Sequence, residues 1–208
     1  MAKPKLFVMP QTRSGTVLWM NEELGGVCDI ELVNLKAGEH KSEKYLAINP
    51  MGKVPALVHD GVAVTEAAAI CATLADAFPD RGLAPAQKDP NRGAYYRWMF
   101  FAPSCIEPMM LDKLGDHKRE NDAAAGHGTE KSVLASINHA ISGKDFILGD
   151  TFSAADVVFG STLNFATMFG AIEKSGAIAD YVDRITARPA FAKMMEANTN
   201  FAADLNLS

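Results

Sequence analysis

The sequence has few of the features that mark specialised classes of protein. It contains three cysteines among 208 residues, Cys28, Cys71 and Cys105, which are far apart and show no metal-ligand spacing. We therefore expect reduced and mostly buried thiols, as in a cytoplasmic protein, and no metal site. No apolar run approaches the ~20 residues that cross a bilayer, and residues 1–5 lead into a strand pattern without a signal-peptide core.

Neither sign of charge is concentrated along the chain. The net charge is -5, from 20 lysines and arginines against 25 aspartates and glutamates. The sequence has no basic block, which argues against nucleic-acid binding. It also has no acidic tail, so a highly charged segment that stays in solvent is not expected. Apolar residues make up 48% and charged residues 22%, which is ordinary for a globular protein. We expect a protein that binds neither nucleic acid nor a membrane.

The first part of the chain alternates between strand and helix patterns. A strand, a helix and a second strand follow one another within about thirty residues, which predicts a parallel βαβ unit. Asp60-Gly61 between two apolar runs predicts a tight hairpin. The order β-α-β-α-β-β-α is that of the thioredoxin-like fold. The expected strands are 5–9, 27–35, 56–59 and 62–64, and the expected helices are 17–24, 42–49 and 65–78.

From about residue 83 onwards only helical patterns are found. A proline-rich linker at 83–90 comes first, and Asp89-Pro90 predicts a helix start. Ser153 and Asp156 have the spacing of a capping box at the start of a further helix. We expect an α/β domain over residues 1–82 and an all-helical domain over 89–208. The later expected elements are a loop at 115–128 and helices at 129–141, 153–169 and 178–195, with a break at Arg188-Pro189.

Two motifs in the first domain carry most of the functional information. One is Asn49-Pro-Met-Gly-Lys-Val-Pro55, and the other is Thr65-Glu-Ala-Ala-Ala-Ile70 at a helix start. A helix start offers free N–H groups and a partial positive charge, which suit a carboxylate. Judged from the residues alone, Pro55 would be a turn proline and Glu66 would only complement the helix dipole.

These motifs, followed by Ser153-Ala-Ala-Asp156 and its helix, resemble the cytosolic glutathione S-transferase family. The sequence of residues 65–79 is most similar to that of bacterial members. The resemblance covers nearly the whole chain. It implies a thioredoxin-like domain followed by a helical bundle, a homodimer, and a cleft at the domain boundary. It also implies conjugation of glutathione to small hydrophobic electrophiles, a detoxification reaction of the EC 2.5.1.18 type. Glutathione would be a co-substrate, with no metal or permanently bound cofactor.

The resemblance also implies a set of glutathione contacts. In the family the Val54-Pro55 bond is cis, which leaves the Val54 backbone to pair with the cysteinyl part of glutathione like a strand. The family's usual Glu-Ser pair is Glu66-Ala67 here, so one hydroxyl contact is missing, although the Ala67 N–H can still donate. The candidate contacts are His40 and Lys53 for the glycyl end, Val54 and Pro55 for the cysteinyl part, and Glu66 and Ala67 for the γ-glutamyl end.

The reactive centre is expected between the first strand and the first helix. A hydrogen-bond donor there, together with the helix start, lowers the thiol pKa from about 8.5 and favours the thiolate. The segment 10–19 contains no tyrosine and no cysteine, and it resembles the variant Pro-x-Ser-Arg-Ser. Thr12 is the first candidate donor, Ser14 the second and Arg13 the third. Taken by themselves, Thr12 and Ser14 are equally suited to cap the helix.

The second substrate is expected to meet the helical domain. The segment 95–101 is rich in aromatic residues, and such a stripe usually belongs to a core or an interface. Tyr96, Phe100 and Met109 are the candidate contacts, whereas Phe165 and Phe169 are expected in the core.

Other functions of the same site stay open at this point. They are a different glutathione-dependent activity, such as that of a peroxidase, disulfide reductase, isomerase or dehalogenase, and a non-catalytic glutathione-binding or ligand-binding role. The absence of a cysteine at 11–14 disfavours mixed-disulfide chemistry through the protein.

Overall fold

The computed structural model describes residues 3–117 and 124–207. The chain groups into two compact units, one of residues 1–81 with 188–208 and one of residues 82–187. The last helix thus packs with the first unit, whereas the sequence patterns alone place it in the helical domain.

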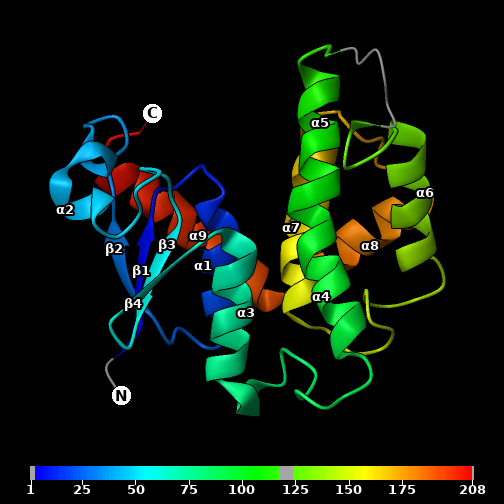
Figure 1. Cartoon of the computed structure of the whole chain (residues 1–208), viewed down its shortest axis with the longest axis horizontal. Coiled ribbons are helices and arrows are strands. Elements are labelled where there is room, and N and C mark those ends of the chain that lie inside the picture. Colours follow the sequence, from blue (N-terminus) through cyan, green and yellow to red (C-terminus); the bar gives the residue numbers. More distant parts are fainter. Residues whose placement is uncertain (1–2, 118–123, 208) are drawn as a thin grey trace. The chain divides into compact units, whose positions relative to one another are not determined.

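The first unit contains a four-stranded sheet in the order β2-β1-β3-β4 (Figure 1). β1 pairs in parallel with β2 and antiparallel with β3, and β3 pairs antiparallel with β4. The parallel pair, the hairpin and the thioredoxin-like topology are therefore confirmed. The elements are β1 (Lys5–Val8), α1 (Ser14–Glu23), β2 (Asp29–Leu32), η1 (Glu39–Lys41), α2 (Glu43–Leu46), β3 (Ala56–His59), β4 (Val62–Thr65), α3 (Ala67–Ala77), η2 (Pro79–Arg81) and α9 (Pro189–Asp204).

Both faces of the sheet are covered. Phe7 points to the face covered by α2, where its ring meets the edge of Tyr45 at 6.0 Å between centroids. Leu6 and Val8 alternate with Phe7, so they point to the opposite face, and both are completely buried. Burial on both faces fixes the register of β1, because a slip of one residue would exchange the two sets.

The C-terminal helix α9 packs along α1. Arg188 donates from Nε and Nη2 to the two carboxylate oxygens of Glu23, at 2.7 Å each. The Trp19 indole N–H donates to the same carboxylate at 2.9 Å, and its ring meets the edge of Phe191 at 5.1 Å between centroids. The pairs 23 with 188 and 19 with 191 run in opposite directions along the two helices, so the helices are antiparallel. These contacts give the physical reason why α9 belongs to the first unit.

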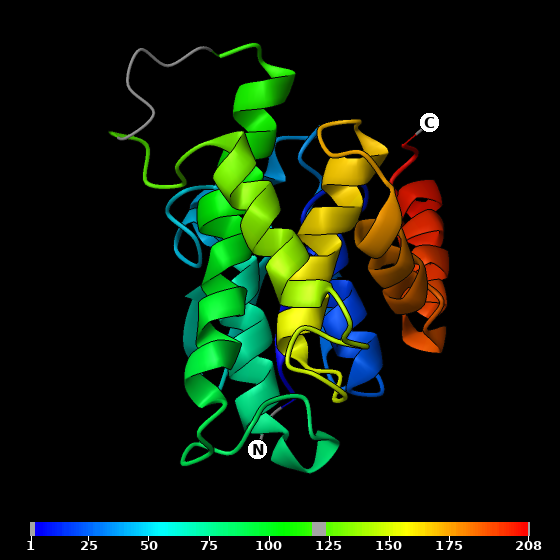
Figure 2. The same cartoon turned by 90° about the vertical axis from the view of Figure 1, so that its right-hand side faces the viewer.

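The second unit is a helical bundle. α4 lies beside α7 in both views (Figures 1 and 2). Between α4 and α5 the chain makes a π-helical turn, η3, which contains Pro103, and α5 contains Pro108; proline lacks the N–H that an α-helical turn needs. The elements are α4 (Arg92–Phe101), η3 (Ala102–Ile106), α5 (Glu107–Leu114), α6 (Glu130–Ile141), α7 (Ala154–Met168) and α8 (Gly176–Thr186).

Two sequence predictions for this unit differ from the structure, and a third lies partly outside the described residues. α4 begins at Arg92 and not at Pro90, and it follows a turn over residues 89–92 in which Asp89 accepts the Asn91 N–H at 2.8 Å with its side chain and the Arg92 N–H at 3.0 Å with its carbonyl. Phe169 is 59% exposed rather than buried, since it follows the last residue of α7. The expected loop at 115–128 includes residues 118–123, which lie outside the described residues.

The capping box at the start of α7 is confirmed and forms part of a buried network. Asp156 is completely buried, and its carboxylate accepts the Ile147 N–H at 2.7 Å, the Ser153 N–H at 2.9 Å and the Tyr181 hydroxyl at 2.8 Å. Burial raises the pKa of Asp156, whereas these hydrogen bonds lower it. Burial and the neighbouring carboxylate raise the pKa of Tyr181 well above its usual value, so its hydroxyl stays a donor.

Within residues 3–117 and 124–207, no helix combines the length and the apolar character that a membrane span requires.

The three thiols are expected to differ in reactivity. Cys28 and Cys71 are buried, and burial raises the pKa of Cys28 to about 12 and that of Cys71 further. Cys105 is half-buried, and its pKa is raised as well. Because the thiolate is the reactive form, an aromatic disulfide reagent at mildly alkaline pH should modify only Cys105, slowly, in the native protein and all three thiols in denaturant. The Cys105→Ala variant should lose the native reaction; rapid modification of a second native thiol would contradict this assignment.

Candidate functional site

The sheet register brings the predicted glutathione contacts of the first unit to one end of the sheet. Phe7 on β1 pairs with Ala56 on β3, and Ala56 pairs with Thr65 on β4. Continued by one or two residues, this register places the end of β1 beside Val54 and places Pro55 beside Glu66. The β1–α1 loop, the segment before β3 and the start of α3 therefore adjoin one another.

The Val54-Pro55 peptide bond is cis, as the resemblance implies. Just before it, the Lys53 carbonyl accepts two hydrogen bonds, from the Tyr45 hydroxyl at 2.6 Å and from Asn49 Nδ2 at 2.7 Å. In the described part of the chain, no backbone–backbone hydrogen bond outside the helices and the sheet involves Val54. These two hydrogen bonds therefore fix the loop through the Lys53 carbonyl. They leave the N–H and C=O groups of Val54 available to pair with a ligand.

Tyr45 and Asn49 are supporting residues to which the sequence patterns assigned no role. Asn49 is buried and also accepts the Met51 N–H at 3.1 Å, so its side chain ties together both ends of the turn at 49–53. Burial raises the pKa of Tyr45 to about 12, which keeps its hydroxyl protonated as a donor. The only signal in the sequence is Asn49 at the head of the first motif.

His40 and Lys53 belong to neighbouring segments. Gly52, which precedes Lys53, has φ +59°, and a Cβ there would lie 3.0 Å from the His40 carbonyl oxygen. Only glycine combines this backbone conformation with so close an approach. Lys53 is exposed, and His40 is half-buried with an Nδ1 atom that has no hydrogen-bond partner within the described residues.

Glu66 occupies an unusual backbone conformation at the start of α3. Its φ is +66° and its ψ is 121°, and its side chain is exposed. Holding a residue other than glycine in a sparsely populated region costs on the order of 1–3 kcal/mol, and such residues are found mainly at functional sites. No side chain caps α3 in the described structure, so the first-turn N–H groups, including that of Ala67, have no acceptor inside the helix. This helix start is therefore suited to bind an anion.

Thr12 and Ser14 form one small hydrogen-bonded group. The Thr12 hydroxyl donates to the Met9 carbonyl at 2.7 Å, lies 3.0 Å from Ser14 Oγ and accepts the Ser14 N–H at 3.1 Å. Ser14 is completely buried, and its Oγ accepts the Met9 N–H at 3.2 Å. Thr12 is only half-buried, and Arg13, also half-buried, is the N-cap of α1 without a side-chain cap bond.

This arrangement gives the two hydroxyls different abilities. Ser14 Oγ already accepts one bond, and its own proton can be donated to Thr12 Oγ1 at 3.0 Å. If the Thr12 proton turns from the Met9 carbonyl toward a ligand, Thr12 Oγ1 still accepts from the Ser14 N–H and the Ser14 hydroxyl. Donors that bind the oxygen of a hydroxyl polarise its O–H bond and strengthen the bond it donates. The geometry favours Thr12 as the group that faces a ligand and Ser14 as its support.

The candidate contacts for a second substrate are only partly brought together. Tyr96 and Phe100 lie one turn apart on α4, are 38% and 58% exposed, and stack with centroids 6.3 Å apart. The Arg92 guanidinium donates to the Tyr96 hydroxyl at 2.9 Å and so fixes that ring. Met109 is only 3% exposed, so its side chain is buried and is not available at that surface.

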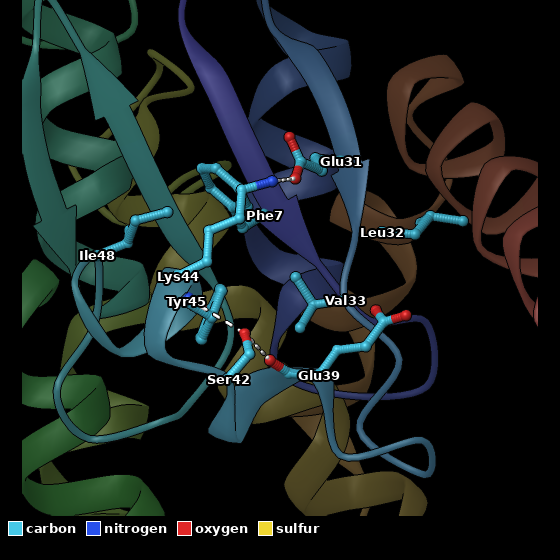
Figure 3. Close-up of a pocket in the computed structure, with 9 residues that line it drawn as sticks. All are labelled: Phe7, Glu31, Leu32, Val33, Glu39, Ser42, Lys44, Tyr45 and Ile48. Atoms are coloured by element: carbon cyan, nitrogen blue, oxygen red, sulfur yellow. Dashed lines mark hydrogen bonds and ion pairs between the residues drawn. The ribbon is translucent and has the colours of Figure 1, made fainter.

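A separate hollow of about 320 Å³ lies between β2 and the η1–α2 segment (Figure 3). Glu31 and Lys44 form an ion pair at 3.6 Å across one side of it, and Ser42 donates to the Glu39 carbonyl at 2.7 Å on the other. None of the residues that line it is a predicted site residue. Tyr45 connects the two places, because its ring lines the hollow while its hydroxyl holds the Lys53 carbonyl.

Residues 13–77 match the glutathione S-transferase N-terminal domain, and residues 95–189 match the glutathione S-transferase C-terminal domain. The chain belongs to the glutathione S-transferase family. The family assignment accounts for the cis Val54-Pro55 bond and for the two-part fold.

Individual relatives are similar over most of their length. Maleylacetoacetate isomerase of Pseudomonas aeruginosa is 31% identical over 77% of this chain and 79% of its own. Protein LigF of Sphingobium sp. is 28% identical over 76% of this chain and 79% of its own. The solved structure of a sphingomonad glutathione S-transferase complexed with glutathione is 29% identical, with a TM-score of 0.76 over 94% of this chain and 98% of that one.

Proposed function

We propose that this family member binds glutathione at the end of its sheet and joins the glutathione thiolate to small hydrophobic electrophiles. The observation that carries the proposal is Glu66, held at φ +66° at the uncapped start of α3, beside the cis Val54-Pro55 bond. One surface thus combines an available strand-like backbone with a helix start that attracts an anion.

Each part of glutathione then has a partner in the first unit. The Val54 N–H and C=O pair with the cysteinyl part, as strands pair in a sheet. The γ-glutamyl carboxylate accepts N–H groups at the start of α3, including that of Ala67, and the Glu66 carboxylate binds the γ-glutamyl ammonium. Lys53 and His40 would bind the glycyl carboxylate, and their position on neighbouring segments of the chain supports this role. The absence of a hydroxyl at Ala67 is expected to weaken binding relative to a serine at that position.

The chemistry requires a thiolate and a donor that stabilises it. The bound thiol releases its proton to solvent, and the Thr12 hydroxyl donates a hydrogen bond to the sulfur anion. The sulfur then supplies its electron pair to the electrophilic carbon and forms a C–S bond. In a substitution the leaving group departs with the electrons of its own bond, and in an addition the resulting carbanion takes a proton from water. On α4, Tyr96 and Phe100 offer an aromatic surface for the electrophile.

Calorimetry with glutathione tests the binding step. We expect the wild-type protein to bind glutathione with a micromolar Kd, and Glu66→Ala to weaken binding at least about tenfold, because a charge-assisted hydrogen bond is lost. Ala67→Ser should tighten binding.

The matched control for the binding step is Glu196→Ala, an exposed glutamate on α9, which should leave Kd unchanged. Wild-type protein that binds no glutathione at millimolar concentration would contradict the proposal.

Turnover of a chloronitroaromatic separates an enzyme from a ligand-binding protein. Conjugation should consume glutathione in proportion to product. Binding without turnover across a panel of aryl halides, epoxides and enones would instead favour the non-catalytic role. The homodimer and the cytoplasmic location that the resemblance implies are part of the same proposal, and sedimentation of the purified protein measures the first of them.

Isomerisation is a second candidate, favoured by the 31% identity with maleylacetoacetate isomerase. There the thiolate would add to a cis double bond, rotation would follow, and elimination would return the thiolate. The two reactions differ in mass balance, because conjugation consumes glutathione and isomerisation does not. A cis-configured conjugated keto acid in the substrate panel therefore distinguishes them.

A further inference from the structure

The contacts between α1 and α9 continue beyond α1 into the loop that carries Thr12. Arg188 and Phe191 of α9 meet Glu23 and Trp19, as described above. Further along, Met194 Sδ lies 3.9 Å from where a Cβ on Gly15 would be. The contacted positions 23, 19 and 15 fall four residues apart, on one face of α1.

The next position in this series is residue 11, one residue before Thr12. The Gln11 backbone N–H donates to Asn198 Oδ1 at 3.1 Å, and this hydrogen bond spans 187 positions of the sequence. Asn198 follows Met194 by four residues, so both lie on the face of α9 that meets α1. The last helix of the chain therefore contacts the β1–α1 loop directly.

Gln11 itself is in an unfavourable conformation. Its φ is +60°, which residues other than glycine and asparagine rarely adopt. Because Gln11 is exposed, burial of its own side chain does not hold this conformation in place. The bond from Asn198 is a tertiary contact that favours it, and the backbone angles at Gln11 decide where the Thr12 hydroxyl points.

We propose that Asn198 is a positioning residue for the glutathione thiolate, acting through Gln11 on the orientation of Thr12. This inference rests on the proposed function, since it assumes that Thr12 faces glutathione. Asn198 does not itself touch the ligand. α9 contacts α1 and the loop before it at both ends, through the Glu23–Arg188 ion pair at one end and through the Gln11–Asn198 hydrogen bond at the other, and only the second contact bears on Thr12.

The test compares Asn198→Ala with three other variants of the full-length protein. Asn198→Ala should lower kcat/KM for a chloronitroaromatic about fivefold to tenfold, the effect of one lost hydrogen bond, and should raise the pKa of the bound glutathione thiol. Backbone amides of residues 11–13 should exchange hydrogen faster. Asn198→Asp keeps the acceptor oxygen and should keep slow exchange.

Two controls separate positioning from general loosening of α9. Asn200→Ala makes the same replacement at an exposed position on the same helix and should change none of these quantities. Arg188→Ala removes the Glu23 ion pair and should lower Tm while leaving the thiol pKa unchanged. If Arg188→Ala raised the thiol pKa as much as Asn198→Ala, the role of Asn198 would be structural only.

The outcomes keep this inference distinct from the proposed function. Unchanged amide exchange at 11–13 in Asn198→Ala would overturn the inference, as would faster exchange without any change in thiol pKa. If the wild-type protein bound no glutathione, the proposed function would fail and the thiolate-positioning role with it. The exchange data would still show whether Asn198 holds the loop.

Discussion

Replacing Thr12 with valine is expected to lower kcat/KM for conjugation about 100-fold, the usual effect of removing one donor to a reacting anion. Valine keeps the shape of threonine but has no hydroxyl, so the thiolate of bound glutathione loses the donor that favours it over the thiol. The thiol pKa should therefore rise toward its free value of about 8.5. The pH dependence of kcat/KM measures this shift, and the loss of rate should be smaller at high pH.

Two further variants test the assignment of Thr12. Thr12→Ser keeps the hydroxyl and should retain most of the activity. Ser14→Ala should lose stability as well as activity, because Ser14 Oγ accepts the buried Met9 N–H and supports Thr12 Oγ1. If Thr12→Val kept normal rates and a normal thiol pKa, the donor would instead be Ser14 or a group of Arg13.

Asp156→Ala is expected to cost about 4 kcal/mol of unfolding free energy. The substitution leaves the Ile147 N–H, the Ser153 N–H and the Tyr181 hydroxyl without their acceptor, and each unsatisfied buried group costs roughly 1–3 kcal/mol. It also removes the reciprocal half of the capping box at the start of α7. Urea denaturation followed by circular dichroism measures the loss.

The matched variant for Asp156 is Asn. Asn can still accept the Ile147 and Tyr181 bonds through its one carbonyl oxygen, but its amide group faces the Ser153 N–H. Asp156→Asn should therefore cost about half as much as Asp156→Ala. A loss below about 1 kcal/mol for Asp156→Ala would mean that water or a rearranged turn replaces the carboxylate.

The features that the sequence predicted correctly have local causes. Asp60-Gly61 predicted the β3–β4 hairpin because few dipeptides suit a two-residue turn between strands. Ser153 and Asp156 predicted the start of α7 because both partners of a capping box lie within four residues. The resemblance of the motif at residues 49–55 to the family predicted the cis Val54-Pro55 bond. In each case the interacting groups are close together in the chain.

The site could be predicted only as a set of residues and not as an arrangement. By sequence Thr12 ranked before Ser14 as the candidate donor, although both were equally suited to cap the helix, and in the structure Ser14 is completely buried whereas Thr12 is only half-buried. Tyr96 and Met109 were both candidate contacts for the second substrate by sequence, and in the structure the first is exposed and the second is buried. The difference depends on which face of a helix meets its neighbours, and helix-helix packing decides this.

The sequence by itself determined the strands and most of the helices, their order, the thioredoxin-like topology and the family, because periodicity, turn residues and caps act over a few residues. Only the tertiary structure decided that α9 packs on α1, that Asn198 holds Gln11, and that Tyr45 and Asn49 support the Lys53 carbonyl. These contacts join residues whose spacing along the chain carries no periodic signal. They form because side chains brought together by the sheet register and by helix packing must satisfy their hydrogen bonds and fill space.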